Sequence, residues 1–198
     1  MAASYGSRLA LAAAMVLGLT AGCSSEPAAT PQRRSAAQKR APGGAFTLVD
    51  TKGRTVTDRT LRGKPYAIFF GFTRCPDVCP TALSRMAQFR KRLGADGDKF
   101  QIVFVSVDSG RDSPADVGAY VDLFGTPILG LTGSEAQIVQ ATKSFRVFFQ
   151  KVPVEGGDYT IDHSAFTVLM DRDGQFRSLL SDQESEASAL AELRRLIA

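Results

Sequence analysis

The chain has 198 residues, of which 44% are hydrophobic and 22% charged, so it fits one globular domain with terminal tails. Its formal net charge is +4, but five of the 24 basic residues and only one of the 20 acidic residues lie in the first 44 positions. The rest of the chain carries 19 residues of each sign, so the basic balance is no evidence for nucleic-acid binding, and we expect none.

The N-terminal segment, residues 1–22, is expected to be a signal that is removed. Arg8 is the only charge before the run LALAAAMVLGLTAGC, which is too short to span a bilayer comfortably. The run resembles a bacterial lipoprotein signal, in which Cys23 becomes the lipidated first residue of the mature chain. The alternative is a plain secretory peptide cleaved nearby, with Cys23 incidental. Residues 23–44 are rich in Ser, Ala, Pro and Gly and predict a flexible tether.

From residue 45 to residue 198 the sequence predicts strands and helices in alternation. AFTLVD (45–50) and RTVT (54–57) flank the turn TKG and predict a hairpin. The apolar runs YAIFFGF (66–72) and FQIVFVSV (100–107) predict strands that are buried on both faces. Helical spacing predicts four helices, which carry Ala82 to Leu93, Val117 to Phe124, Ile138 to Phe148, and Leu190 to Ile197. SAFTVLMD and QFRSLL predict a second hairpin before the last helix.

This order of elements predicts a thioredoxin-like α/β sheet flanked by helices, with an N-terminal β-hairpin added. We expect no membrane-spanning segment within it.

Thr132 and Glu135 in TGSE have the spacing of a helix capping box. Polar residues before this box and phenylalanines after it are also given expected roles. Asp108, Arg111 and Asp112 are interpreted as caps of the next helix, or as the rim of a site, and Phe145, Phe148 and Phe149 as core residues.

Two cysteines lie between the first buried strand and its following helix, in GFTRCPDVCP (71–80). Pro80 suits the first turn of a helix, so Cys79 is expected at the helix N-terminus, where free amides favour a thiolate. An exported pair would by default form a structural disulfide. The loop between Cys75 and Cys79 is too short for that bond to stabilise much, and the carboxyl end of a buried strand is where α/β sheets bind ligands. Reversible oxidation and metal binding both remain open.

The only histidine of the chain, His163, precedes the apolar strand of the second hairpin. In a thioredoxin-like fold, a loop at this place faces the two thiols. Two thiolates and one imidazole form a soft set of three ligands that suits Cu(I). Zinc with an open fourth position is the alternative, and an exported thiol site favours copper.

The segments GFTRCPDVCPTAL, VSVDSGRDSPADVGAYVDLFG, GLTGS and DYTIDHSAFTVLMDRDG together resemble the Sco/SenC family of copper chaperones. The resemblance implies that Cys75, Cys79 and His163 bind copper. It also implies that the protein delivers copper to the dinuclear CuA centre of cytochrome c oxidase, or reduces the cysteines of that centre. Ser109 and Phe72 stand where the family usually has proline and tyrosine, which leaves every ligand in place and bears on docking instead.

The same resemblance implies the partners and the location of the protein. The partners would be the oxidase subunit that carries CuA and other copper chaperones. A membrane tether agrees with lipidation of Cys23, which would place a monomeric domain on the extracytoplasmic or periplasmic side of a cell membrane.

Two mechanisms use the same residues. In a copper carrier, Cys75, Cys79 and His163 hold Cu(I) and pass it on by ligand exchange. In a thiol-disulfide oxidoreductase, the redox-active pair Cys75 and Cys79 reduces a partner without carrying copper. A thiol peroxidase is less favoured, because the proline-led threonine motif of peroxiredoxins is missing from FTRCPDVCP.

Two carboxylates beside these residues have open roles. Asp77 lies between the thiols and is interpreted either as a recognition or tuning group or as a solvated turn residue. Asp162 could orient the imidazole as a hydrogen-bond acceptor, or point away from it.

Overall fold

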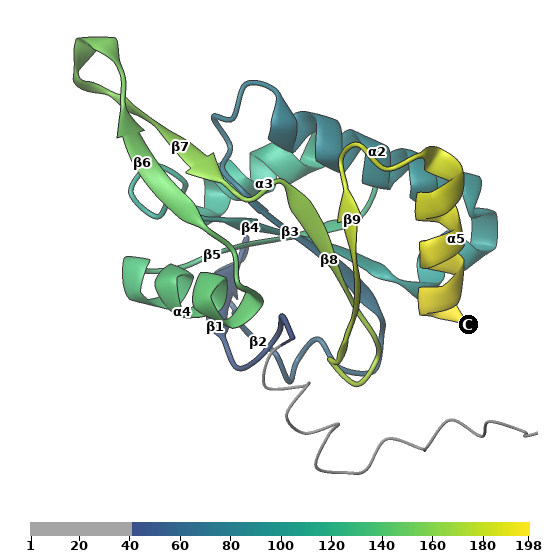
Figure 1. Cartoon of the computed structure of the whole chain (residues 1–198). Helices are drawn as coiled ribbons and strands as arrows, with labels where there is room; N and C mark the ends of the chain where they lie inside the picture. Colours follow the sequence, from purple (N-terminus) through teal and green to yellow (C-terminus); the bar gives the residue numbers. More distant parts are fainter. Residues whose placement is uncertain (1–40) are drawn as a thin grey trace, which may run out of the picture.

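A computed structural model describes residues 41–198, so the signal, Cys23 and most of the tether lie outside the described residues. Its centre is a seven-stranded mixed sheet with the order β2-β1-β5-β4-β3-β8-β9 (Figure 1). The strands of this sheet are β1 (Thr47–Asp50), β2 (Thr55–Thr57), β3 (Tyr66–Gly71), β4 (Gln101–Ser106), β5 (Ile128–Thr132), β8 (Phe166–Met170) and β9 (Phe176–Ser181).

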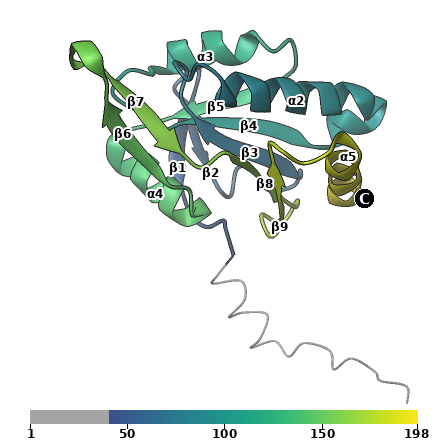
Figure 2. The ribbon, with the colours of Figure 1, turned by 45° about the horizontal axis from the view of Figure 1, so that its top comes forward.

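The helices cover both faces of the sheet. They are α2 (Val78–Arg92), α3 (Pro114–Asp122), α4 (Glu135–Phe145) and α5 (Glu186–Ile197), with short 3₁₀ turns at Gly94–Lys99 and Glu155–Gly157. Helices α2 and α3 lie over one face and α4 over the other, while α5 packs against α2 and β9 (Figure 2). Within residues 41–198, no helix is both long and apolar enough to cross a bilayer.

The core is built around β3 and β4, which pair in parallel. Every residue of β3 is buried, and so is every residue of β4 after Gln101, which confirms the two buried strands predicted from their apolar runs. The predicted N-terminal hairpin is confirmed as β1 and β2, and β1 joins the sheet by antiparallel pairing with β5. The loops that follow β3 and β4 therefore emerge side by side at one edge of the sheet.

Two helix starts differ from the sequence interpretation. The cap of α4 is Ser134, which exchanges hydrogen bonds with Gln137, so the capping box lies two residues after the predicted Thr132 and Glu135. The cap of α3 is Ser113 with Asp116 as its partner. The interpretation of Asp108, Arg111 and Asp112 as caps is therefore wrong. In both α3 and α4, the serine directly before the helix has the extended backbone conformation that a cap requires.

Helix α4 ends earlier than the sequence predicts, since the predicted helix extended to Phe148. The helix ends at Phe145 because Arg146 takes a left-handed backbone conformation, with φ of 57°. Phe145 is buried and Phe149 is partly buried against the core, as expected. Phe148 is 58% exposed, so its assignment to the core is wrong.

A second, two-stranded sheet follows α4 and was missed by the sequence analysis. It consists of β6 (Phe149–Pro153) and β7 (Tyr159–His163), which pair antiparallel. We call it the β6–β7 ribbon. It projects from the body of the domain, at the upper left in Figure 1. Its turn contains Gly156 and Gly157, both with positive φ, and this glycine pair is the signal that could have revealed a hairpin.

Candidate metal centre

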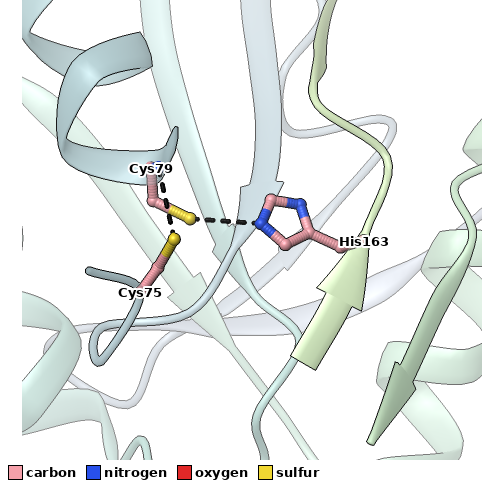
Figure 3. Close-up of side chains that lie close together, drawn as sticks. All are labelled: Cys75, Cys79 and His163. Atoms are coloured by element: carbon pink, nitrogen blue, oxygen red, sulfur yellow. Dashed lines mark hydrogen bonds between the residues drawn. The ribbon is translucent and has the colours of Figure 1, made fainter. Parts of the chain in front are cut away.

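Three side chains from separate parts of the chain converge at the edge of the sheet (Figure 3). Cys75 lies in the loop after β3, Cys79 in the first turn of α2, and His163 is the last residue of β7. One donor atom from each, the two Sγ atoms and a ring nitrogen, lie within 4.8 Å of one another. Cys79 Sγ is 3.3 Å from His163 Nε2. His163 thus ends a strand of the ribbon, where the sequence analysis expected a loop.

The two thiols are both free and differ in how deeply they are buried. Cys79 is fully buried, whereas Cys75 is about half-buried at the mouth of the site. Cys79 lies directly over the end of β3: a Cβ atom at Gly71 would come within 2.5 Å of its sulfur. Only glycine therefore lets Cys79 pack this closely against the strand.

The first turn of α2 is directed at Cys75. Asp77 occupies the N-cap position but makes no side-chain cap to the helix, which leaves the first amides available to another acceptor. The amide of Cys79 donates a hydrogen bond to Cys75 Sγ over 3.4 Å. A helix N-terminus that points at a sulfur atom favours the thiolate form.

The pKa values of the two thiols are shifted in opposite directions. The side-chain hydrogen bond from Cys79 lowers the pKa of Cys75 to about 3, helped by the amides of Cys79 and Asp77, while burial opposes the shift. The same hydrogen bond and the burial of Cys79 raise the pKa of that thiol. At neutral pH the pair therefore consists of a Cys75 thiolate and a Cys79 thiol. A metal ion that binds both sulfurs must displace the proton of Cys79.

The imidazole is held by its other nitrogen and by two aromatic rings. His163 Nδ1 lies 3.0 Å from the carbonyl oxygen of Ser164. A carbonyl only accepts hydrogen bonds, so Nδ1 carries the proton and the lone pair of Nε2 faces the sulfur atoms. Phe69 and Phe72 both contact the imidazole edge to face, with ring centroids 5.9 Å away. Sequence reasoning gave none of these three neighbours a role at the site.

The two acidic residues singled out from the sequence do not join the centre. Asp162 is exposed, and because side chains alternate along a strand it lies on the opposite face of β7 from His163. The carbonyl of Ser164, and not the carboxylate of Asp162, accepts the hydrogen bond that orients the imidazole. Asp77 is exposed, and its carboxylate makes a 3.5 Å contact with Thr81 Oγ1.

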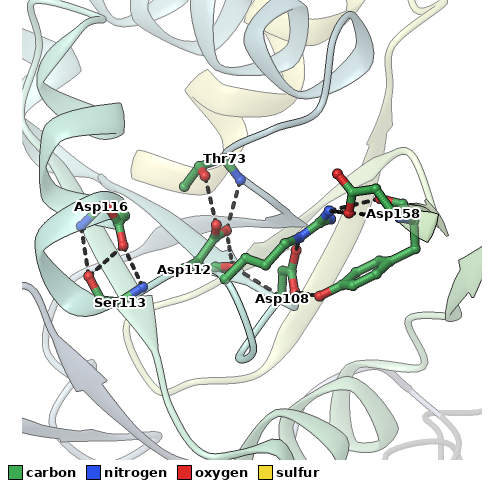
Figure 4. Close-up of polar contacts among 9 residues, drawn as sticks. Thr73, Asp108, Asp112, Ser113, Asp116 and Asp158 are labelled. Atoms are coloured by element: carbon green, nitrogen blue, oxygen red, sulfur yellow. Dashed lines mark hydrogen bonds and ion pairs between the residues drawn. The ribbon is translucent and has the colours of Figure 1, made fainter. Parts of the chain in front are cut away.

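The loop that leads to Cys75 is fixed by a buried carboxylate. Asp112 is 2% exposed and accepts hydrogen bonds from Thr73 N at 2.8 Å and Thr73 Oγ1 at 2.7 Å (Figure 4). It also accepts a bond from Ser106 Oγ at the end of β4. Asp112 therefore joins the cysteine loop to the end of β4. This position agrees with the alternative interpretation of Asp112, as a residue at the rim of the site.

An open mixed sheet with a dithiol at the start of its first long helix, completed by an imidazole from a separate ribbon, defines a thioredoxin-like protein with a soft-metal or redox centre. The SCO1/SenC family model matches residues 34–198. The chain belongs to the SCO1/SenC family.

Individual relatives agree with this membership. Protein sco1 of Schizosaccharomyces pombe is 41% identical over 138 residues, which cover 68% of this chain and 52% of that protein. The structure of Bradyrhizobium japonicum ScoI with copper bound is 46% identical, with a TM-score of 0.73, and the match covers 79% of this chain and 99% of that one. For yeast Sco1 with copper bound the identity is 37% and the TM-score 0.73, over 78% and 87% of the two chains. These matches confirm the predicted thioredoxin-like fold.

The chain spans about half the length of several curated relatives that it matches, the Schizosaccharomyces pombe protein among them.

Proposed function

We propose that this protein is a copper carrier that holds one Cu(I) ion between Cys75 Sγ, Cys79 Sγ and His163 Nε2. The observation that carries the proposal is the convergence of these three donor atoms within 4.8 Å. Two thiolates and a neutral imidazole match the preference of Cu(I) for soft ligands in low coordination numbers. The copper-bound structures of two relatives support the choice of copper over zinc.

The unequal burial of the two thiols suggests an order of ligand exchange. An arriving ion meets the half-buried Cys75 thiolate first, then binds Cys79 as that thiol loses its proton, and His163 Nε2 completes the set. Delivery reverses this order: two ligands of a partner replace His163 and then Cys79, which regains a proton from water, while Cys75 still holds the ion at the mouth. Each step exchanges one metal–ligand bond for another, and the copper stays Cu(I) throughout.

The destination and the location are further parts of the proposal. By family membership, the recipient is the cytochrome c oxidase subunit that carries the CuA centre, and other copper chaperones supply the ion. Residues 1–22 would be removed, Cys23 lipidated, and residues 23–44 would tether the domain of residues 45–198 to the outer side of a cell membrane. A lipid-modified Cys23 at the N-terminus of the mature protein, measured by mass spectrometry of the membrane fraction, tests this arrangement. A cleaved but unmodified N-terminus contradicts it.

A second function is favoured by the different environments of the two thiols. Cys75 is accessible and Cys79 is buried behind it, as in a nucleophile and its resolving thiol. The Cys75 thiolate would attack a partner disulfide, form a mixed disulfide and expel one partner thiolate. Cys79, after passing its proton to the expelled partner thiolate, would attack Cys75 Sγ and release the second partner thiolate. The partner gains two electrons, and the protein is left with a Cys75–Cys79 disulfide.

One experiment separates the two functions. The reduced protein is titrated with Cu(I) against a chromogenic chelator, with His163→Ala, Cys75→Ser and Cys79→Ser measured beside the wild type. A copper carrier loses affinity by orders of magnitude in all three variants, whereas His163→Ala keeps a pair of thiols that still reduces a model disulfide. Wild-type copper affinity in His163→Ala would contradict the three-ligand site, and absence of tight binding by the wild type would leave the reductase.

A further inference from the structure

His163 belongs to the β6–β7 ribbon, which side chains, and not strand pairing, join to the main sheet. The β6–β7 ribbon lies outside the seven-stranded sheet, and its strands pair only with each other, from Phe149 opposite His163 to Pro153 opposite Tyr159. A two-stranded ribbon is marginally stable by itself. The position of its histidine therefore depends on the contacts that join the ribbon to the body of the domain.

One attachment lies at the base of the ribbon, where Ile161 is buried in the hydrophobic core and Phe149 packs against the core. The amide of Phe148 donates a hydrogen bond to Ser164 Oγ, and the amide of Ser164 donates to the carbonyl of Phe148, both over 3.0 Å. These bonds extend the pairing of the two strands past His163, so the ribbon can rotate as one body about a pivot at its buried base. Because the imidazole projects from the ribbon near this pivot, a rotation of the ribbon changes the direction in which Nε2 points.

The second attachment lies at the start of β7 and opposes such a rotation (Figure 4). Tyr159 donates its hydroxyl proton to Asp108 Oδ1 over 2.7 Å. Arg111 Nε donates to Asp108 Oδ2 over 2.6 Å, and Arg111 Nη1 donates to the carbonyl of Tyr159 and to Asp158 Oδ1, each over 2.8 Å. The guanidinium carbon lies 3.6 Å from the centre of the Tyr159 ring.

This second attachment is well shielded from water. Asp108 is fully buried and the side chain of Arg111 is 12% exposed, so their interaction is only weakly screened by solvent. A Cβ atom at Gly110 would lie 3.4 Å from the Tyr159 hydroxyl oxygen. The loop after β4 thus runs directly beneath the tyrosine.

The loop after β4 also holds the cysteine side of the centre. Asp108 in this loop bonds Tyr159 of the ribbon, and Asp112, four residues later, bonds Thr73 of the cysteine loop. One hydrogen-bonded turn links the two aspartates, because the amide of Asp112 donates to the carbonyl of Asp108 over 2.9 Å. A continuous set of short contacts therefore connects the loop that carries Cys75 to the strand that carries His163.

We infer that Asp108, Arg111 and Tyr159 form a clamp that sets the distance between the thiols and the imidazole. The inference rests on the proposed function, since it explains how a site for Cu(I) is preorganised from two elements. The three are positioning residues: they act through the β6–β7 ribbon and are not ligands. Loss of the clamp leaves all three donor groups in the protein but lets the ribbon rotate, so that fewer molecules hold them together and copper affinity falls.

The test measures Cu(I) affinity by chelator competition in Arg111→Ala and Tyr159→Phe. We expect the dissociation constant to rise about 100-fold in the first variant and about tenfold in the second, as for partners that orient metal ligands. X-ray absorption of the copper-loaded Arg111→Ala protein is expected to show a weaker nitrogen contribution with both sulfur ligands kept. A merely structural role would not change the ligand set.

Each variant has a matched control. Arg54 donates through Nε to Asp50, a carboxylate that is 3% exposed in β1, so Arg54→Ala removes a guanidinium from a buried aspartate far along the sheet. Tyr120→Phe removes a buried hydroxyl that has no hydrogen-bond partner within residues 41–198. Both controls leave the contacts among Asp108, Arg111 and Tyr159 in place, so they are expected to keep the wild-type dissociation constant within about threefold.

The outcomes separate the clamp from the proposed function. If the wild type binds no copper, the copper-carrier proposal fails, and the clamp is judged on the metal-free protein by the NMR signals of the His163 ring and its contacts with Phe69 and Phe72. Loss of those contacts in Arg111→Ala supports the clamp. Unchanged ring contacts and wild-type copper affinity in both variants overturn it. If Arg111→Ala does not fold, Tyr159→Phe, which removes one oxygen atom, decides.

Discussion

A single methyl group at Gly71 tests the packing of the metal centre. The added Cβ atom of Gly71→Ala would lie 2.5 Å from Cys79 Sγ and 3.1 Å from carbon atoms of Phe69 and Phe104. Non-bonded heavy atoms in proteins pack at about 3.5–4.0 Å, so the sulfur has to move by roughly 1 Å. It cannot move inward, because the surrounding residues are buried and closely packed.

Overpacking of this kind costs about 1–3 kcal/mol of folding free energy. The displaced sulfur also leaves its position 3.3 Å from His163 Nε2, so copper affinity is expected to fall as well. Urea unfolding of the reduced, metal-free protein measures the first effect, and chelator competition measures the second. Gly118→Ala in α3 is the control, because its added Cβ meets Thr51 at an ordinary 3.4 Å and alanine favours the helix.

A double-mutant cycle with Cys79→Ala isolates the clash itself. Removing the sulfur relieves the 2.5 Å contact, so Gly71→Ala should destabilise the Cys79→Ala protein by about 1 kcal/mol less than it destabilises the wild type. Strict additivity of the two substitutions, or full copper affinity in Gly71→Ala, would refute the argument that the sulfur is packed against the strand.

Three further predictions concern the thiols and the buried aspartate. Iodoacetamide should modify Cys75 at a rate that is nearly constant between pH 5 and pH 8, because its pKa of about 3 makes it a thiolate throughout, and should leave buried Cys79 unmodified; a rate that rises tenfold per pH unit would contradict this. Folding lowers the pKa of Cys75 from about 9 to about 3, so between these pH values the unfolded chain binds more protons at this thiol than the folded protein does. The free energy of unfolding of the reduced protein should therefore rise as the pH rises from 5 to 8. Thermal unfolding of Cys75→Ser should show a smaller rise. Asp112→Asn should destabilise the domain by about 2–4 kcal/mol in urea unfolding, because it disturbs a buried carboxylate with three hydrogen bonds to Thr73 and Ser106; a loss below about 0.5 kcal/mol would show that the cysteine loop does not depend on it.

The sequence predicts the elements whose signals are local. The runs that became β3 and β4 are almost entirely apolar, which leaves a buried strand as the simplest interpretation. Pro80 marks the start of α2 and so places Cys79 at its N-terminus. His163, which the structure places beside these thiols, was identified from the family resemblance and the expected fold.

The parts that were missed depend on contacts between distant residues. Asp112 is 39 positions from its partner Thr73, and nothing in the motif VDSGRDSP distinguishes such a partner from a local helix cap. The β6–β7 ribbon escaped notice because β6 is mostly exposed and shows no simple alternation. Phe148 was assigned to the core by its helical spacing, and a left-handed residue at Arg146 ends that helix before Phe148 is reached.

The 84 positions that separate Cys79 from His163 have a thermodynamic consequence. An ion shared by these side chains would join two distant stretches of polypeptide, and would stabilise the folded state because it binds that state in preference to the unfolded chain. A recipient that extracts the cargo therefore also unfastens the donor. The free energy of transfer must then include this loosening, so a carrier that is loose when empty would surrender its ion more readily than one that stays rigid without it.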